Sequence, residues 1–294
     1  MRFVAPARDK VDSSVFSRPP LSEWREFAQL IETPDWPRID ALNSITALAR
    51  LQDGGVPVNE WRFVEQTPAL LADGLHYEQR IAERGEIATR EGNWHDLLNA
   101  LVWLRYPALK AALNARQIAE IAVAGPKRRT RAQCALTHFD EAGVVVLLHD
   151  PALLRLWDAH DWHGLFWRER EAWSDGRACA HVFGHALLEH ALKPGQLLVG
   201  KALVVAMRQR ENAQDDANGS SAEASRTIAE LAAVIRRGEL LNDPQELRPL
   251  PLSGIPGWHP DNVAERFYRE ALCFCPLRDG RRYPAPFAER DLRG

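Results

Sequence analysis

The spacing of hydrophobic residues along this chain predicts that most of it folds into helices. Trp24, Phe27 and Leu30 recur three residues apart after Ser22, a residue type that often caps a helix start. Pro107 ends one helical pattern and begins the next, because proline is tolerated in a first helical turn and disfavours helix just before it. We expect helices over residues 22–31, 40–51, 77–84, 93–105, 107–121, 151–158, 162–172, 186–192, 197–207 and 262–272, and one more ending at 237.

A few segments carry a β pattern instead. Residues 135–139 and 144–148 are rich in β-forming side chains and flank a polar turn that ends at Gly143, which predicts a β-hairpin. Residues 63–65 predict a short strand, and residues 177–183 fit either a strand or a helix start. The expected fold class is therefore mainly α (α+β), a helical domain with a small β-hairpin.

No linker separates two hydrophobic cores, so we expect a single domain over residues 1–294. Residues 1–20 are rich in proline, serine and charge and are expected to form an extended arm. Residues 211–226 contain no large apolar side chain, which predicts a flexible insertion or a frayed helix end. The proline-containing residues 244–294 are expected to pack on the core as an irregular C-terminal segment.

The composition disfavours several classes of protein. A net charge of −3 provides no overall field for nucleic acid or an anionic membrane, and the one basic cluster, residues 127–131, fits a solvated loop. The apolar run at 197–207 is shorter than the about 20 residues that span a bilayer. With no export signal, a cytoplasmic location is expected, and the 4 cysteines, which lack metal or redox spacing, are expected to be free thiols.

The helix start Asn93-Trp-His-Asp96 is the feature that most suggests chemistry. An imidazole and a carboxylate side by side can share one divalent ion, as in metal-dependent phosphohydrolases. Asp96 also stands three residues after Asn93, where a carboxylate caps backbone amides, and this structural role is the preferred interpretation for Asp96. Capping does not explain His95 and Asn99, which lie one turn apart on one helical face. For His95, a buried histidine satisfied by core partners is the preferred interpretation, and a site residue is the alternative.

A second cluster combines His181, His185 and Glu189 at intervals of four residues. Two histidines four residues apart on a helix can bind one metal ion. Gly184 interrupts that helix, however, and the glutamate that follows the first histidine of the zinc peptidase motif is absent. The pattern therefore leaves His185 as a candidate ligand without identifying a known metal motif.

Other candidates concern proton transfer and substrate binding. Asp140 and Glu141 are paired carboxylates and are candidates for acid and base chemistry. Asp140 also has a structural reason to stand in the predicted turn, whereas Glu141 does not need to be acidic there. Arg90 and Arg129 are candidates for holding an anionic group. The chain contains no nucleophile elbow, phosphate loop or dinucleotide motif, so nothing supports serine, cysteine or dinucleotide chemistry.

Four stretches of the chain are distinctive: residues 90–110, 136–141, 183–186 and 249–258. Together they resemble a bacterial family of unknown function, numbered 3025. The resemblance covers residues of about 20 to 280 and implies a bacterial cytosolic origin and one full-length domain. It implies no activity, cofactor or catalytic residue.

Three hypotheses about function remain open. The first is a metal-assisted hydrolase of a small anionic substrate, in which His95, Asp96 and His185 hold the ion. In this scheme Glu141 or Asp140 activates water with Asn99 beside them, and Arg90 or Arg129 holds the substrate anion. The second is a metal-free binder or enzyme that uses histidine as acid and base, and the third is a non-catalytic scaffold. The first hypothesis predicts that His95 and His185 lie within about 10 Å of each other, because ligands of one ion each lie about 2 Å from it.

Overall fold

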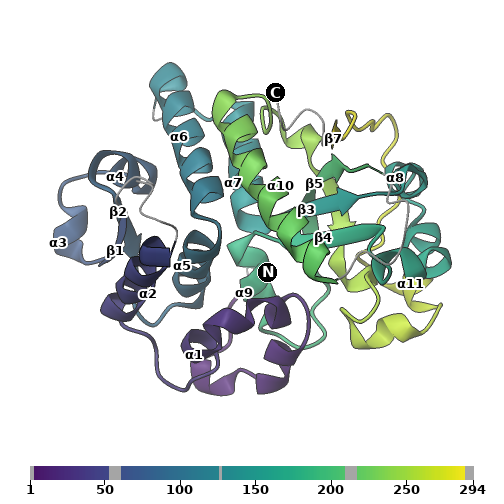
Figure 1. Ribbon diagram of the computed structural model, residues 1–294, viewed down its shortest axis with the longest axis horizontal. Helices are drawn as coiled ribbons and strands as arrows, with labels where there is room; N and C mark the ends of the chain where they lie inside the picture. Colours follow the sequence, from purple (N-terminus) through teal and green to yellow (C-terminus); the bar gives the residue numbers. More distant parts are fainter. Residues whose placement is uncertain (1–2, 53–60, 126–127, 209–216, 289–294) are drawn as a thin grey trace.

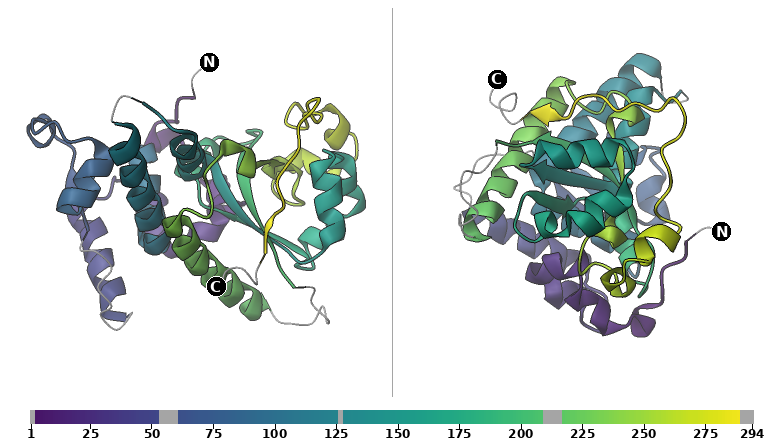
Figure 2. Two further views of the ribbon diagram at one scale, coloured as in Figure 1. Left: turned by 90° about the horizontal axis from the view of Figure 1, so that it is seen from above. Right: turned by 90° about the vertical axis from the view of Figure 1, so that its right-hand side faces the viewer.

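The computed structural model describes residues 3–52, 61–125, 128–208 and 217–288. It contains a helical part built mainly from the first half of the chain and a part organised around a five-stranded sheet (Figure 1). The two further views show the same two parts, with the N-terminal turns packed beneath them (Figure 2). The fold is 53% helical and 13% strand, so the predicted mainly α (α+β) class is confirmed.

Most helices lie where hydrophobic periodicity predicts them. They are α2 (Ile39–Gln52), α4 (Tyr77–Arg84), α5 (Trp94–Arg105), α6 (Pro107–Ala124), α8 (Pro151–Asp158) and α9 (His185–Ala191). Shorter helices are α1 (Ala28–Ile31), α3 (Pro68–Leu71) and α11 (Phe267–Glu270). None of the described helices is long and apolar enough to cross a membrane.

Some segments expected to be α-helical or extended form 3-10 or π turns instead. The helix expected at 22–31 is a 3-10 helix over Leu21–Phe27 that continues into α1, and the helix expected at 162–172 contains a π turn over Gly164–Arg168 and a 3-10 turn over Arg170–Trp173. The segment expected to be an extended arm contains a 3-10 turn over Ser13–Ser17 with buried hydrophobic side chains. These segments bury aromatic side chains, so packing decides their backbone rather than helix propensity.

The larger sheet has the order β4-β3-β5-β6, and β7 (Phe287–Ala288) also pairs with β5. Its central strands, β3 (Gly143–Leu148) and β5 (Val199–Ala206), are parallel, and β4 (Ala178–Val182) and β6 (Arg248–Pro251) flank them in antiparallel pairing. Every residue of β3 is buried, as expected for a strand covered on both faces. A separate parallel pair, β1 (Arg62–Glu65) and β2 (Glu86–Thr89), borders α4 and includes the short strand expected at 63–65.

The predicted β-hairpin at 135–148 is wrong. Residues Arg131–Ala142 form helix α7, which begins with a capping box between Thr130 and Gln133. Gly143 then connects the helix directly to β3, and a Cβ at this position would lie 2.2 Å from the carbonyl oxygen of Phe139. The glycine therefore marks the end of a helix rather than a hairpin turn, and β3 pairs with β4 and β5.

Two further expectations change with the sheet. The apolar run expected to be a helix at 197–207 is the buried strand β5, because a short apolar run carries no period that separates a buried strand from a buried helix. Of the expected flexible insertion at 211–226, residues 211–216 lie outside the described residues. From residue 217 onwards the chain is helical, in α10 (Ala217–Arg237), which packs beside α6.

The backbone at Gly184 brings distant segments together. A Cβ on Gly184 would lie 2.5 Å from the Cα of Ala142 and 2.5 Å from the amide nitrogen of Gly143, so only glycine fits between β4 and the end of α7. Residue 185 then begins α9 directly beside the last turn of α7. Helix α5 packs on the other side of α9, so three helices from different parts of the chain meet at one place.

Candidate functional site

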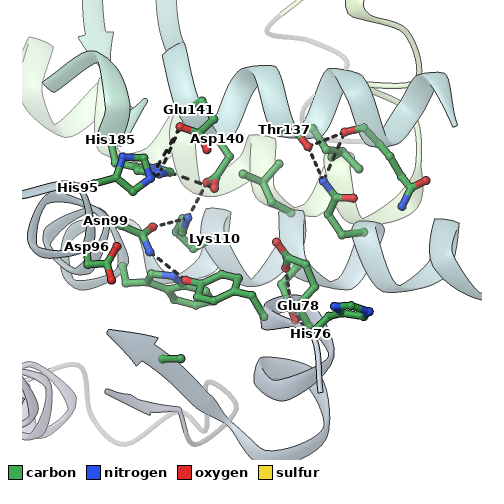
Figure 3. A pocket seen from close by; sticks show the side chains of 18 of the residues that line it. His76, Glu78, His95, Asp96, Asn99, Lys110, Thr137, Asp140, Glu141 and His185 are labelled. Atoms are coloured by element: carbon green, nitrogen blue, oxygen red, sulfur yellow. Dashed lines mark hydrogen bonds and ion pairs between the residues drawn. The ribbon is translucent and has the colours of Figure 1, made fainter. Parts of the chain in front are cut away.

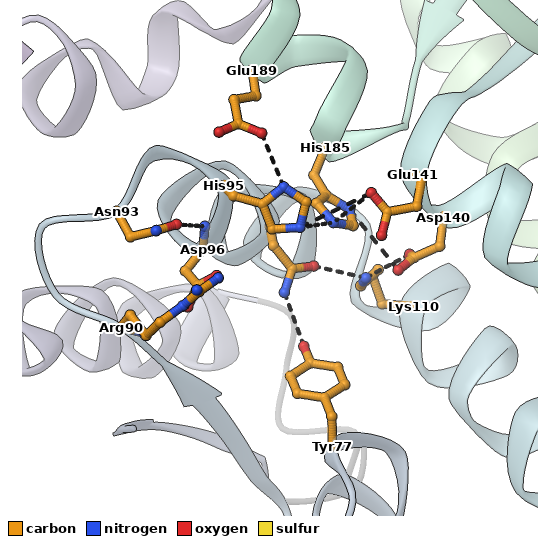
Figure 4. A network of polar contacts seen from close by, with 11 residues as sticks. Tyr77, Arg90, Asn93, His95, Asp96, Lys110, Asp140, Glu141, His185 and Glu189 are labelled. Carbon is orange, nitrogen blue, oxygen red and sulfur yellow. Dashed lines mark hydrogen bonds and ion pairs between the residues drawn. The ribbon is translucent and has the colours of Figure 1, made fainter. Parts of the chain in front are cut away.

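The start of α5 directs His95 into this meeting point. Asn93 caps the helix, and its side-chain oxygen accepts a hydrogen bond from the Asp96 amide at 3.0 Å. The Asp96 carboxylate accepts bonds from the Arg90 backbone amide at 2.7 Å and from the Arg90 guanidinium at 2.7 and 2.9 Å. The neighbouring residues His95 and Asp96 therefore have different roles. Asp96 pairs with Arg90 at the helix start, and His95 points towards α9 (Figure 4).

His95 is held by a glutamate on α9. Its Nδ1 lies 3.0 Å from Oε2 of Glu189, and this hydrogen bond to a carboxylate raises the pKa of His95 above its usual value. Because a carboxylate only accepts, Nδ1 carries the proton. The Nε2 atom of His95 is then directed at His185 (Figure 4).

His185 completes the pair from the first turn of α9. Its Nε2 lies 3.1 Å from Nε2 of His95, and the side chain is only 4% exposed. The expected proximity of these two histidines is thus confirmed. Burial lowers the pKa of His185 to about 3, so its imidazole is neutral near pH 7. Among the described residues its buried Nδ1 has no hydrogen-bond partner, and an Asp140 carboxylate oxygen lies 3.9 Å away.

Glu141, at the end of α7, adds a carboxylate to the pair. Its Oε2 lies 3.6 Å from Nε2 of His185 and 4.0 Å from Nε2 of His95. Burial raises the pKa of Glu141 above its usual value. Ligand atoms of His95, Glu141 and His185 all lie within 4.8 Å of one another, and these three are the group in the described part of the chain that could hold a metal ion.

A chain of hydrogen bonds leads away from the three residues. The Nζ atom of Lys110 lies 2.6 Å from an Asp140 carboxylate oxygen and 2.8 Å from the side-chain oxygen of Asn99, whose amide nitrogen donates to the hydroxyl of Tyr77 at 2.9 Å. Burial acts to raise the pKa of Asp140, but the positive charge of Lys110 and its hydrogen bond to the carboxylate are the main opposing causes, and the pKa is lowered. Asp140 is therefore an ionised, paired carboxylate beside His185.

The three residues lie at one side of a cleft of about 720 Å³. Figure 3 shows its wall along α6 and α7, with His76 and Glu78 of the α4 region opposite. Burial raises the pKa of Glu78, and the side chain of Asn114 donates to its carboxyl group at 2.5 Å. Further along α7, the guanidinium of Arg129 donates to the hydroxyl of Thr137 at 3.1 Å. The cleft thus combines a group of side chains able to hold an ion with a buried carboxyl group and several arginines.

The structure brings together most of the residues singled out from the sequence. His95, Asn99, Asp140, Glu141 and His185 meet, and Asp96, Arg90 and Arg129 also line the cleft. Asp96 is outside the three-residue group, where Glu141 stands instead. His181 points elsewhere: it lines a separate 290 Å³ cavity beside α6 and α10, and burial lowers its pKa to about 4.

Sequence reasoning gave no role to Lys110, Glu78 or Tyr77. The only signal for Lys110 is its spacing with Asn114 and Gln117, three polar residues that share the buried face of an otherwise apolar helix. Glu189 had a signal, since it stands four residues after His185. Its place behind His95, however, depends on how α5 and α9 pack.

Comparison with known proteins identifies a family without a known role. A family model described as a protein of unknown function (DUF3025) matches residues 61–278, which include every residue of the site. No curated protein matches the chain. No solved structure matches it either.

Proposed function

This chain belongs to the DUF3025 family of proteins of unknown function, so its role must be inferred from its site, and we propose that it is a metal-dependent hydrolase of a small anionic substrate. In this proposal His95, His185 and Glu141 hold one divalent ion at the wall of the cleft. A bacterial origin belongs to the same proposal. So does a cytoplasmic location, because free cysteines suit a reducing compartment.

The observation that carries the proposal is the pairing of the two Nε2 atoms. Two imidazole nitrogens that bind zinc at about 2.0–2.1 Å in tetrahedral geometry lie about 3.3 Å apart, and these two lie 3.1 Å apart. The Glu141 oxygen lies 3.6 and 4.0 Å from them, close enough to serve as a third ligand of the same ion. Two histidines and one glutamate leave a fourth position open, as in catalytic zinc sites.

The surrounding carboxylates support the same assignment. Metal-binding histidines usually donate their second ring N–H to a carboxylate or carbonyl group, which fixes the tautomer and strengthens the ligand. Nδ1 of His95 donates to Glu189, and Nδ1 of His185 faces Asp140. With an ion between the two Nε2 atoms, each ring would carry its proton on Nδ1, next to an acidic group. Without an ion, one of two facing nitrogens must be protonated.

A bound ion would polarise the bond to be hydrolysed and activate water near pH 7. The protein's own groups would do the rest. Asp140 and Glu189 would orient the two imidazoles, and Lys110, held by Asp140, would keep Asn99 facing the cleft. This differs from the scheme expected from the sequence in two ways: Glu141 becomes a ligand rather than a base, and Asp96 is not a ligand.

Elemental analysis of the purified protein tests the proposal. We expect about one zinc ion per chain in the wild type, and its loss in His95→Ala, His185→Ala and Glu141→Ala with circular dichroism unchanged. His76→Ala is the matched control, because His76 lines the cleft outside the three-residue group, and it should retain the ion.

Two results would overturn the proposal. Wild-type protein that binds no metal even after incubation with zinc would favour metal-free acid and base chemistry or a scaffold. Stoichiometric iron would retain the ion site but replace hydrolysis, because two histidines and a carboxylate around iron are typical of oxygenases.

A further inference from the structure

Two of the four lysine and arginine side chains that line the cleft are already neutralised. Arg90 forms a bidentate pair with Asp96, and Lys110 is paired with Asp140. Arg128 and Arg129 also line the cleft, and neither has a carboxylate partner among the described residues. Of these two, Arg129 donates a hydrogen bond to another side chain of the cleft wall.

The side chain of Arg129 is exposed and is hydrogen-bonded to the cleft wall. It donates to Oγ1 of Thr137, which in turn donates to the Gln133 carbonyl at 2.9 Å and accepts from the Gln117 amide at 3.2 Å. Thr137 therefore uses its hydrogen-bonding capacity within the protein. The guanidinium has five N–H donors, so others remain for a ligand in the cleft.

Thr137 also relates this guanidinium to the proposed ion site. It precedes Glu141 by four residues on α7, and side chains at that interval have Cβ atoms about 5–6 Å apart on one helical face. Because the guanidinium lies 3.1 Å from the Thr137 hydroxyl and the proposed ion lies at the end of the Glu141 side chain, the free donors are on the order of 10 Å from the ion. That distance corresponds to a few covalent bonds.

We propose that the substrate is an amide with a free carboxylate close to the hydrolysed bond, of the N-acyl amino acid type, and that Arg129 binds this carboxylate. The inference rests on the proposed ion site. In a phosphate monoester the reacting group is itself the anion and would lie at the ion, which leaves Arg129 without a ligand. In an N-acyl amino acid the carboxylate lies three bonds from the carbonyl carbon, within the available distance, and the arginine fork matches a carboxylate.

The reaction that follows is simple hydrolysis. The oxygen of water adds to the amide carbonyl carbon, and the carbon–nitrogen bond breaks. A proton from the water passes to the leaving nitrogen. The products are the free amino acid and the carboxylic acid of the acyl group, and no oxidant, reductant or second substrate takes part.

Two hydroxamic acids of equal length test the inference without knowledge of the natural substrate. Hydroxamates bind through the metal ion, so zinc-loaded protein is titrated by calorimetry with succinic acid monohydroxamate, which carries a carboxylate, and with butyrohydroxamate, which does not. We expect the first to bind roughly 10- to 100-fold more tightly, since a hydrogen-bonded charged pair replaces an apolar end. Arg129→Gln should reduce that ratio to about one.

The control is Arg155→Gln, which removes the same charge from an exposed position on α8 outside the cleft and should leave the ratio unchanged. Equal binding of both hydroxamates to the wild type would overturn the carboxylate inference while the ion site stands. Tighter binding of 3-phosphonopropanohydroxamate than of the carboxylate compound would overturn the choice of a carboxylate. Failure of all of them to bind, with no zinc retained, would mean that the proposed function itself is wrong.

Discussion

The Nε2 atoms of His95 and His185 lie 3.1 Å apart, although 90 residues separate them in the chain. Each ring turns its Nδ1 towards a different acidic residue, Glu189 for His95 and Asp140 for His185. Two nitrogen lone pairs directed at each other would repel, so the pair requires either a shared proton or a shared cation. If a cation is shared, the carboxylates of Glu189 and Asp140 orient the two rings, and their removal should measurably weaken metal binding.

Replacing Glu189 should weaken metal binding without abolishing it. In Glu189→Ala, His95 loses the acceptor that fixes its tautomer, and we expect zinc affinity to fall about 10- to 100-fold. Competition with a zinc chelator measures the change. Glu83→Ala, at an exposed position on α4, is the control and should bind zinc like the wild type. Unchanged affinity in Glu189→Ala would argue against an ion on Nε2 of His95.

Asp96 should prove structural rather than catalytic. Its carboxylate accepts three hydrogen bonds from Arg90 and stands in the first turn of α5. Asp96→Ala should therefore lower the free energy of unfolding by about 1–2 kcal/mol, as measured by urea denaturation, and retain full zinc stoichiometry. Loss of zinc from a variant of normal stability would instead return Asp96 to the ligand set.

The contrast between these residues shows what local sequence could predict. Asn93, Asp96 and the apolar residues after them predicted the start of α5 correctly, because a cap and a helical period are local signals. The same kind of reasoning failed at Gly143. A glycine after β-forming residues fits a hairpin turn and a helix end equally well, and the burial of β3 against two distant strands decided between them.

The candidate site shows the same limit. Polar residues in apolar segments singled out His95, Asn99 and His185, and burying such groups does require partners. Which partners they meet depends on how α5, α7 and α9 pack together. The local sequence around each residue does not predict this packing. The spacing of Lys110 on the buried face of α6 does not indicate its partners, because its role follows only from Asp140 and Asn99 lying beside it.

A double-mutant cycle should measure a coupling free energy between Lys110 and Asp140. Lys110 is 3% exposed, so Lys110→Met leaves the Asp140 carboxylate without its main counter-charge and should cost about 3 kcal/mol of unfolding free energy. Adding Asp140→Asn removes the unpaired charge. The double variant should then be more stable than Lys110→Met alone, in urea titrations of chelator-treated protein. Strictly additive effects would mean that the pair contributes no coupling.

A last prediction concerns pH and lies away from the cleft. Glu23, partly buried on the 3-10 helix before α1, has its pKa raised from 4.5 to about 7 by burial, with Arg105 opposing and Glu26 adding to the shift. The folded protein therefore holds a proton that the unfolded chain releases between these pH values. Its contribution to stability is fully present below pH 4.5 and is lost as the pH rises through 7.

Glu23→Gln removes this titration, since glutamine stays neutral. Above pH 7 the variant should be more stable than the wild type by about 1–3 kcal/mol, a range reduced for partial exposure of the side chain, and the difference should vanish near pH 4.5. Thermal unfolding between pH 4.5 and 8 measures it, with the exposed Glu32→Gln as the matched control. A stability difference independent of pH would show that Glu23 ionises normally in the folded protein, with Arg105 compensating its burial.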